Sequence, residues 1–216
     1  MAINSLSTGF RPGVCTSSTR PTAPYDGQQI YETDTDMLAI WNGSAWRYIA
    51  ATTPTNGSIL QVVSTTKTDT YSVSTAGSIW NEITGLAATI TPKSTTSKVL
   101  VQLSMTVGGS LDGGTPGYQI MIQIQRGATS IGVGDAAGSR TRASASTPHS
   151  SIFYMSSIAF SHLDNPSTIS ATTYSVDIRH PSGATQTLYV NRSADDTDAA
   201  TRPRTVSTLT LMEISG

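Results

Sequence analysis

The chain has 216 residues, of which 12% are charged and 37% hydrophobic, and its formal net charge at pH 7 is −1. This length fits one full domain plus an appended region, because domains cluster near ~100–150 residues. The basic residues are scattered singly, so no stripe follows a phosphate backbone and we expect no nucleic-acid partner. The absence of a long apolar run and of signal-peptide features predicts a soluble chain, made in the cytoplasm, with no membrane partner.

The composition predicts an all-β protein. Ser and Thr are abundant, whereas the helix formers Glu, Lys and Leu are scarce. Thr fits a pleated, half-buried surface, and Ser and Gly supply turns. The single cysteine, Cys15, cannot form an internal disulfide, and no Cys and His cluster has zinc spacing, so we expect a free thiol, no metal and no cofactor.

Residues 1–27 are expected to form an extended arm. Pro12, Pro21, Pro24 and several glycines interrupt this segment, and such a composition resists regular structure. An arm of this kind becomes ordered when another surface holds it, so we expect it to lie on a neighbouring subunit or partner.

Residues 28–50 are expected to form a small β-meander, followed by a linker over residues 51–57. Asn42-Gly43 favours a tight hairpin turn, because both residue types accept positive φ angles. Trp41 and Trp46 flank this turn and should lie within reach of one another. Two short hairpins rarely stand alone, so the unit must pack on something else.

Residues 58–216 are expected to form a β-sandwich knob. The clearest strand runs over residues 98–107, where Val99, Val101 and Leu103 alternate with polar neighbours. We expect further strands at residues 59–63, 70–73, 79–83, 88–91, 118–126, 150–162, 172–180, 187–192 and 206–214. About ten strands with no helical period between them favour an antiparallel sandwich of jelly-roll type. Residues 111–117 and 144–149 should be exposed loops.

Part of the N-terminal sequence resembles a module found in many bacteriophage virion proteins. The residues that carry this resemblance are 11–24, 27–35 and 41–46, the last being the Trp-Asn-Gly-Ser-Ala-Trp hairpin. The knob is similar to a family of phage structural proteins through residues 59–63, 90–94, 132–140, 189–193 and 208–215. The resemblance implies a homotrimeric knob, displayed on a tail fibre or as a capsid decoration.

Motifs of catalysis are weak in this chain, and we expect no enzyme. Gly132, Gly134 and Gly138 depart from the spacing of a dinucleotide-binding loop, which predicts a conformationally demanding loop between strands near a subunit contact. His149, His162 and His180 lie far apart in sequence, and no G-x-S-x-G nucleophile motif is present. Paired acids for glycan cleavage remain open, since strands bring distant residues together.

Charged and aromatic residues of the knob allow two interpretations each. The carboxylates of Asp195, Asp196 and Asp198 could bind calcium, although they lack EF-hand spacing, or form a solvated acidic loop that pairs with nearby arginines. The relevant arginines are Arg192, Arg202 and Arg204, and Arg140 and Arg142 share the ambiguity. Phe153, Tyr154 and Phe160 are expected in the core or in a subunit contact, because a sugar-binding platform would expose them.

The favoured hypothesis is a virion structural protein, a homotrimeric capsid decoration protein that clamps major capsid protein subunits through its N-terminal arm. The alternative is a tail-fibre tip or receptor-binding knob that attaches to tail proteins and binds a host surface ligand. The absence of a long shaft between module and knob favours the shell. The residues expected at attachment or oligomer contacts are Arg11, Pro12, Tyr31, Trp41, Trp46, Arg140 and Arg192.

Overall fold

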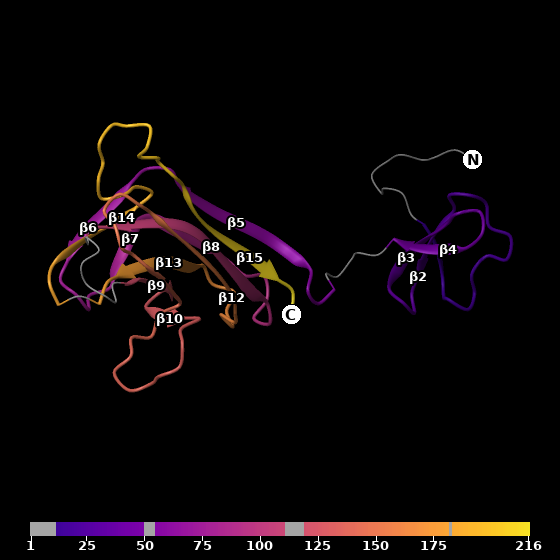
Figure 1. Ribbon diagram of the computed structural model, residues 1–216. Helices are drawn as coiled ribbons and strands as arrows, with labels where there is room; N and C mark the ends of the chain where they lie inside the picture. Colours follow the sequence, from indigo (N-terminus) through magenta and orange to yellow (C-terminus); the bar gives the residue numbers. More distant parts are fainter. Residues whose placement is uncertain (1–11, 50–54, 111–118, 182) are drawn as a thin grey trace. The chain divides into compact units, whose positions relative to one another are not determined.

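The computed structural model describes residues 12–49, 55–110, 119–181 and 183–216, and these contain strands, turns and loops but no helix (Figure 1). The prediction of an all-β chain is therefore confirmed. The chain divides into two compact units, Met1–Thr55 and Asn56–Gly216, and the division falls within the segment expected as a linker. The two units are described separately below.

The N-terminal unit is a four-stranded sheet in the order β1-β2-β3-β4. Its strands are β1 (Gly13–Cys15), β2 (Gln29–Glu32), β3 (Met37–Trp41) and β4 (Trp46–Ile49). Strands β2, β3 and β4 form the expected antiparallel meander, and β1 pairs with β2 in parallel. Residues 1–27 are thus not all an arm: residues 13–15 complete the edge of the sheet, which satisfies the backbone groups of β2.

The turn between β3 and β4 differs from the tight Asn-Gly hairpin that we expected. It is a four-residue loop closed by a backbone hydrogen bond from the Asn42 amide to the carbonyl of Ala45 (3.1 Å). Gly43 has a φ of 90°, but Asn42 does not adopt a positive φ. Instead, the Asn42 side-chain oxygen accepts from the amides of Ser44 (3.2 Å) and Ala45 (2.9 Å), so the side chain rather than the backbone conformation of Asn42 organises the turn.

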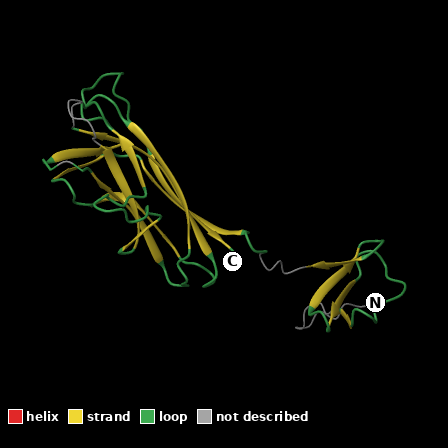
Figure 2. Cartoon of the chain, turned by 60° about the horizontal axis from the view of Figure 1, so that its bottom comes forward, coloured by secondary structure: helices red, strands yellow, loops and turns green. Residues whose placement is uncertain are grey.

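The second unit is an antiparallel β-sandwich of two sheets (Figure 2). The six-stranded sheet contains β5 (Ile59–Lys67), β6 (Tyr71–Thr75), β8 (Lys98–Gly109), β12 (Ser156–Asp164), β14 (Gln186–Val190) and β15 (Ser207–Ile214). The five-stranded sheet contains β7 (Asn81–Ile90), β9 (Gln119–Arg126), β10 (Thr129–Ile131), β11 (Ala145–Pro148) and β13 (Thr172–Arg179). The antiparallel sandwich is therefore as predicted, whereas its jelly-roll connectivity stays a prediction.

Strand β8 is the centre of the six-stranded sheet. Leu103 of β8 pairs with Phe160 of β12 on one side and with Leu209 of β15 on the other. Strand β14 lies on the same side of β8 as β15, because Val107 pairs with both Ser156 of β12 and Val190 of β14. Strand β5 continues the sheet beyond β15, and β12 forms the opposite edge.

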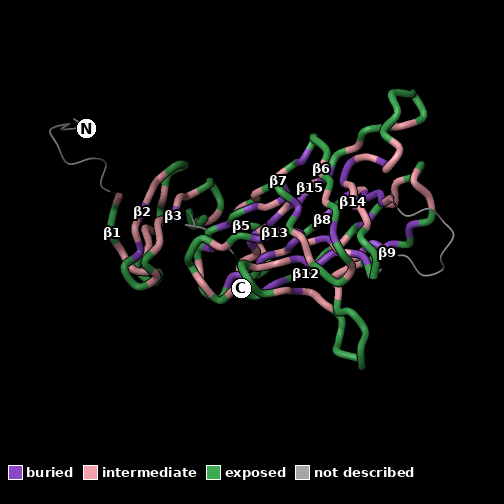
Figure 3. The backbone as a smooth tube through the Cα atoms, turned by 90° about the vertical axis from the view of Figure 1, so that its left-hand side faces the viewer, coloured by how far each residue is buried: buried purple, intermediate pink, exposed green. Residues whose placement is uncertain are grey.

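The core lies between the two sheets and is built from alternate residues of both. Val99, Val101, Leu103 and Met105 of β8 are buried, as their alternation predicted. They pack with a cluster from β7, β9, β13, β14 and β15, and Figure 3 shows buried segments along the strands and exposed ones at the loops. One charged network crosses this core: Arg126 of β9 contacts both carboxylate oxygens of Asp164 on β12.

Several strand boundaries differ from the sequence prediction. The segments expected at 79–83 and 88–91 form one strand, β7, which accommodates Gly85 at a φ of 83°. Residues 144–149, expected as an exposed loop, include strand β11 paired with β9, and His149 is buried. The strand expected over 150–162 begins only at Ser156, because residues 150–155 turn outside the sheet. The short strands β1 and β10 were not predicted, and residues 111–117 lie outside the described residues.

Candidate functional site

A buried carboxylate organises the N-terminal unit. The Glu32 side chain on β2 is fully buried and paired with the guanidinium of Arg20, which enters from the segment before β2. Its Oε2 atom also accepts hydrogen bonds from the hydroxyls of Tyr48 (2.9 Å) and Thr35 (3.1 Å). The hydrogen bond from Arg20 is the largest cause that holds the pKa of Glu32 below its usual value. The network ties residue 20 and strands β2 and β4 into one rigid unit.

The N-terminal residues expected at contacts are distributed over this unit. Trp41 and Trp46 face one another across the β3–β4 hairpin, with ring centroids 5.6 Å apart and planes at 62°. Tyr31 lies on β2 and its hydroxyl donates to Asp36, and Pro12 directly precedes β1. Arg11 lies outside the described residues. Trp41 and Trp46 therefore pack on each other within the chain, as the sequence predicted.

The acidic loop after β14 pairs with its own arginines. Asp195 accepts from the Nε of Arg202 (2.7 Å), and Asp196 pairs with Arg192 (2.9 Å) and with Arg204. These arginines lower the pKa of Asp196, with Arg204 the largest cause. The loop is thus cross-linked by ion pairs within one chain, and within the described ranges no three His, Cys, Asp or Glu side chains converge as metal ligands would.

Exposed aromatic residues lie beside this acidic loop. The Asp195 amide donates to the carbonyl of Ile152 (2.9 Å), which holds the loop against residues 151–155. In that segment the side chains of Phe153 and Tyr154 are 45% and 71% exposed, and the Arg202 guanidinium lies 4.9 Å from the Phe153 ring centroid. Phe153 and Tyr154 were expected in the core or in a subunit contact; they precede β12 and do not lie in the core, so the subunit contact stays a prediction. Phe160, inside β12, packs against the core as expected.

Three further knob residues that the sequence singled out, Arg192, Arg140 and His149, contact groups of the same chain. Arg192 lies over the ring of Tyr189, with 4.1 Å from its guanidinium carbon to the ring centroid. Arg140 is exposed in the loop after β10, where its Nη1 donates to the Ala137 carbonyl (3.4 Å). His149 is buried and contacts the Gly109 backbone, and its burial lowers the pKa of the imidazole. Arg140 and Arg192, the knob residues expected at contacts, therefore lie on two different loops, one after β10 and one after β14.

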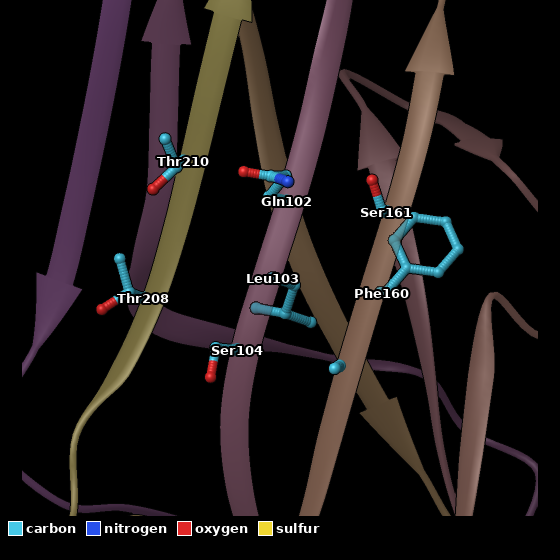
Figure 4. Close-up of a pocket in the computed structure, with 8 residues that line it drawn as sticks. Gln102, Leu103, Ser104, Phe160, Ser161, Thr208 and Thr210 are labelled. Atoms are coloured by element: carbon cyan, nitrogen blue, oxygen red, sulfur yellow. The ribbon is translucent and has the colours of Figure 1, made fainter.

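The outward face of the six-stranded sheet is largely uncharged: among the outward residues of β5, β8, β12 and β15, the charged one is Lys98, at the start of β8. We call it the outer face and define it by the outward residues of β5, β15, β8 and β12: Val62, Ser64, Thr66, Thr208, Thr210, Met212, Leu100, Gln102, Ser104, Thr106, Ser157, Ala159, Ser161 and Leu163. Figure 4 shows Thr208 and Thr210 of β15 beside Gln102 and Ser104 of β8 on this face. Their short side chains leave a shallow hollow of about 550 Å³.

Strand register arranges the outer face in rows that cross the sheet. Met212 pairs with Val62 on one side and with Leu100 on the other, and Leu100 pairs with Leu163. These four residues form one apolar row, in which Val62 is 56% and Leu163 47% exposed. The next two rows are polar or small: Ser64, Thr210, Gln102 and Ser161, then Thr66, Thr208, Ser104 and Ala159. The outer face thus carries one row of large aliphatic residues beside two rows of polar or small residues.

The outward face of the five-stranded sheet differs in chemistry. It carries Glu82 on β7 and both Asp177 and Arg179 on β13. Asp177 accepts a hydrogen bond from Gln125 (3.0 Å), and burial is the largest cause that raises the pKa of its carboxyl. Within the described residues, the outward face of the five-stranded sheet thus carries charges of both signs, whereas the strands of the outer face carry Lys98 at one end.

Sequence reasoning missed the apolar row, although a local signal marks it. The alternation used to predict the strands assigns one side of each strand to the core, and Val62, Leu100, Met212 and Leu163 all lie on the other side. Each interrupts the alternation, as in the sequence Val99-Leu100-Val101. An apolar residue on the outward side of a strand is the signal, but only the strand register shows that the four are neighbours.

Comparisons with known proteins show no family. No protein-family model and no curated protein matches this chain. Among solved structures, the chain is similar to one in a structure of the infectious bursal disease virus Gx strain, with 13% sequence identity and a TM-score of 0.39. The match covers 81% of this chain and 40% of that chain, so this protein spans about two fifths of its length. No helix among the described residues is long and apolar enough to cross a membrane.

Proposed function

We propose that this chain is a non-enzymatic structural protein of a bacteriophage virion, a homotrimeric capsid decoration protein. One observation carries the proposal: a small, separately packed N-terminal sheet precedes a β-sandwich that has its own core. This division fits an attachment module joined to a displayed knob. The resemblance of residues 11–46 to a virion module supports the same assignment. On this proposal the N-terminal unit clamps major capsid protein subunits and the knob faces outward.

The N-terminal sheet is suited to attachment because it forms a compact unit of its own. Among the described residues, the buried Glu32 pairs with three side chains of the same unit: Arg20, Thr35 and Tyr48. Its outer surface also exposes apolar groups, with Val14 69% and Tyr25 71% exposed. Exposed apolar side chains on a small rigid sheet give a partner surface that needs little further ordering.

A second function, host-surface binding by a tail-fibre tip, is favoured by one observation. Phe153 and Tyr154 are exposed beside the ion-paired loop of residues 192–204. Aromatic faces next to arginine and carboxylate groups can stack on a ligand and hydrogen-bond to it. If the protein lies at the tail, this loop cluster is the surface that we expect to contact the host.

The proposed attachment role is tested by deleting residues 1–55 and comparing particle association with the full chain. We expect the shortened knob to stay folded by circular dichroism and to be absent from purified particles. Incorporation of the shortened knob at the level of the full chain would refute the assignment. Electron cryomicroscopy of intact particles separates the two functions: density on the head supports decoration, and density at the tail with the knob outermost supports host binding.

A further inference from the structure

We infer that a hollow in the loop after β14 binds a neutral sugar ring, with the exposed aromatic residues beside it as the stacking surface. The inference rests on the proposed host-surface binding and deepens it, because it names the class of ligand and the residues that would bind it. It is argued from the hollow, the aromatic side chains at its edge and the balance of charges around it.

The hollow lies in the loop of residues 192–204, which projects beyond the strands and is coloured gold in Figure 1. Its volume is about 240 Å³, below the ~300–1,000 Å³ of pockets that take drug-sized ligands, so it suits one small ring. We call it the loop pocket, and its lining residues are Asp196, Thr197, Asp198, Ala199, Arg202 and Arg204. Because most of these side chains are charged, a ligand in the loop pocket must hydrogen-bond to them.

Exposed aromatic side chains border the loop pocket. Arg202 lines the pocket, and its guanidinium carbon lies 4.9 Å from the centroid of the Phe153 ring. The next residue, Tyr154, is 71% exposed. A sugar ring has a face of C–H groups that can pack on an aromatic ring while its hydroxyl groups bond elsewhere. A sugar-binding platform was expected to expose Phe153 and Tyr154, and both are exposed.

The balance of charges favours an uncharged ligand. The loop of residues 192–204 contains three arginines and three aspartates, so its formal charge is zero. Asp195 pairs with Arg202, and Asp196 pairs with Arg192 and with Arg204. A phosphate or sulfate group would need arginines that are not already neutralised. A divalent cation would need several convergent carboxylates, and within the described parts of the chain no group of three is present.

The loop pocket offers both acceptors and donors to sugar hydroxyl groups. Asp198 is exposed at the pocket, and its carboxylate has no ion pair or hydrogen bond within the described residues. Arg204 is 51% exposed, and its ion pair with Asp196 uses Nη1. A guanidinium has five N–H donors, so others remain for a ligand. Neighbouring hydroxyls of a sugar both donate and accept, and they can therefore bond to a carboxylate and to a guanidinium.

The loop pocket is held in place before any ligand arrives. The Nε of Arg202 donates to Asp195 (2.7 Å), and its Nη1 donates to the carbonyl of Thr201 (3.2 Å). Asp195 also accepts from the hydroxyl of Thr197 (2.6 Å), and its amide donates to the carbonyl of Ile152 (2.9 Å). Binding then orders few further side chains, which lowers its entropic cost.

The test measures sugar binding by the full chain with saturation-transfer NMR. The probes are glucose, galactose, mannose, rhamnose and N-acetylglucosamine, with glucose 6-phosphate as the anionic comparison. Each is used at about 10 mM, because a single ring in a small hollow binds in the millimolar range. The variants are Tyr154→Ala and Asp198→Ala, and circular dichroism with thermal unfolding establishes that each is folded.

Two matched controls accompany these variants. Tyr154→Phe keeps the aromatic ring, and Asp135→Ala removes an exposed carboxylate from the loop after β10. We expect at least one neutral sugar to bind the unmodified chain. Tyr154→Ala and Asp198→Ala should each weaken this binding at least about fivefold, because each removes one contact to the sugar. Tyr154→Phe and Asp135→Ala should bind within about twofold of the unmodified chain.

Four outcomes would overturn the inference. They are binding of none of the five neutral sugars, tighter binding of glucose 6-phosphate than of glucose, and sugar binding that both Tyr154→Ala and Asp198→Ala leave unchanged. The fourth is a change of oligomeric state in Tyr154→Ala by sedimentation velocity, because the aromatic residues would then lie in a subunit contact.

Failure of the sugar site and failure of the proposed host binding are separate results. If the knob lies outermost at the tail and no sugar binds, host binding stands and the sugar site is refuted. If a sugar binds at the loop pocket while the density lies on the head, the sugar site stands and the tail-fibre function is refuted.

Discussion

The network that joins the two sheets at Asp164 should carry a large share of the knob's stability, and Asp164→Ala tests this directly. The Asp164 side chain is 7% exposed and accepts from Arg126 Nη1 at 2.8 Å to each oxygen. The Tyr174 hydroxyl donates to its Oδ2 atom at 2.7 Å. Because Asp164 lies on β12 and the other two lie on β9 and β13, the substitution breaks a contact between sheets.

The magnitude follows from what the substitution leaves behind. Removing one partner of a buried ion pair costs about 3–5 kcal/mol, but Arg126 is 28% exposed and regains some water, which lowers the figure to about 2–4 kcal/mol. The Tyr174 hydroxyl is left buried without its acceptor. A domain of ~150–250 residues loses about 2–4 °C in Tm per kcal/mol, so we expect a fall of roughly 4–16 °C.

The assay is calorimetry and urea unfolding of the full chain at fixed concentration, since association would shift apparent stability. Tyr174→Phe is the matched control: it removes one hydroxyl but keeps the ion pair, and should cost about 1 kcal/mol. A double-mutant cycle of Asp164→Ala with Arg126→Ala should give a coupling of at least ~1.5 kcal/mol. The reasoning fails if Asp164→Ala costs less than about 1 kcal/mol or if the two substitutions are additive.

Three further predictions concern single residues. Because the pKa of Glu32 is lowered in the folded state, its contribution to stability is fully present above its unfolded pKa of about 4.3 and is lost as pH falls through the lower folded pKa. Glu32→Gln should therefore flatten the loss of stability in acid. Tryptophan fluorescence that follows unfolding from pH 7 to 2 measures this. Asn42→Ala should cost the N-terminal unit about 1–2 kcal/mol in urea unfolding, because two turn amides lose their acceptor, and no loss would contradict the turn described. Gly132→Ala should lower the Tm of the knob by a few degrees, because the new Cβ would lie 2.6 Å from the Phe160 ring and the backbone φ is 57°. Gly134→Ala is the control and should leave the Tm unchanged, because no atom lies within 4 Å of its Cβ position.

Local patterns predicted the strands but not their ends. The alternation at residues 98–107 predicts β8 because period-two burial is a property of the chain alone. The same alternation cannot show that residues 144–149 form β11, since this segment is polar and becomes a strand only by pairing with β9. Likewise, Gly13–Cys15 forms a strand because the edge of β2 is available to it, and no local propensity marks that.

The candidate sites were predicted unevenly for the same reason. The contact between Trp41 and Trp46 followed from a short hairpin, in which sequence distance fixes spatial distance. The ion pairs among Asp195, Asp196 and the nearby arginines were one of two interpretations, and the loop geometry shows these pairs. Phe153 and Tyr154 were expected in the core or in a subunit contact, and the core alternative failed because hydrophobicity alone cannot distinguish a strand from the exposed turn before it.

The sequence by itself determined the all-β class, the division near residue 55 and which side of each long strand is buried. These depend on composition, turn residues and alternation, which act between close neighbours in the chain. The tertiary structure alone decided which strands are adjacent and in what register. Pairing of β5 with β15 and of β15 with β8 joins residues more than 100 positions apart, and pairing of β8 with β12 adds a fourth strand. Together these pairings turn four isolated residues into the apolar row of the outer face. Register between distant strands is set by the whole sheet, so no single segment encodes it.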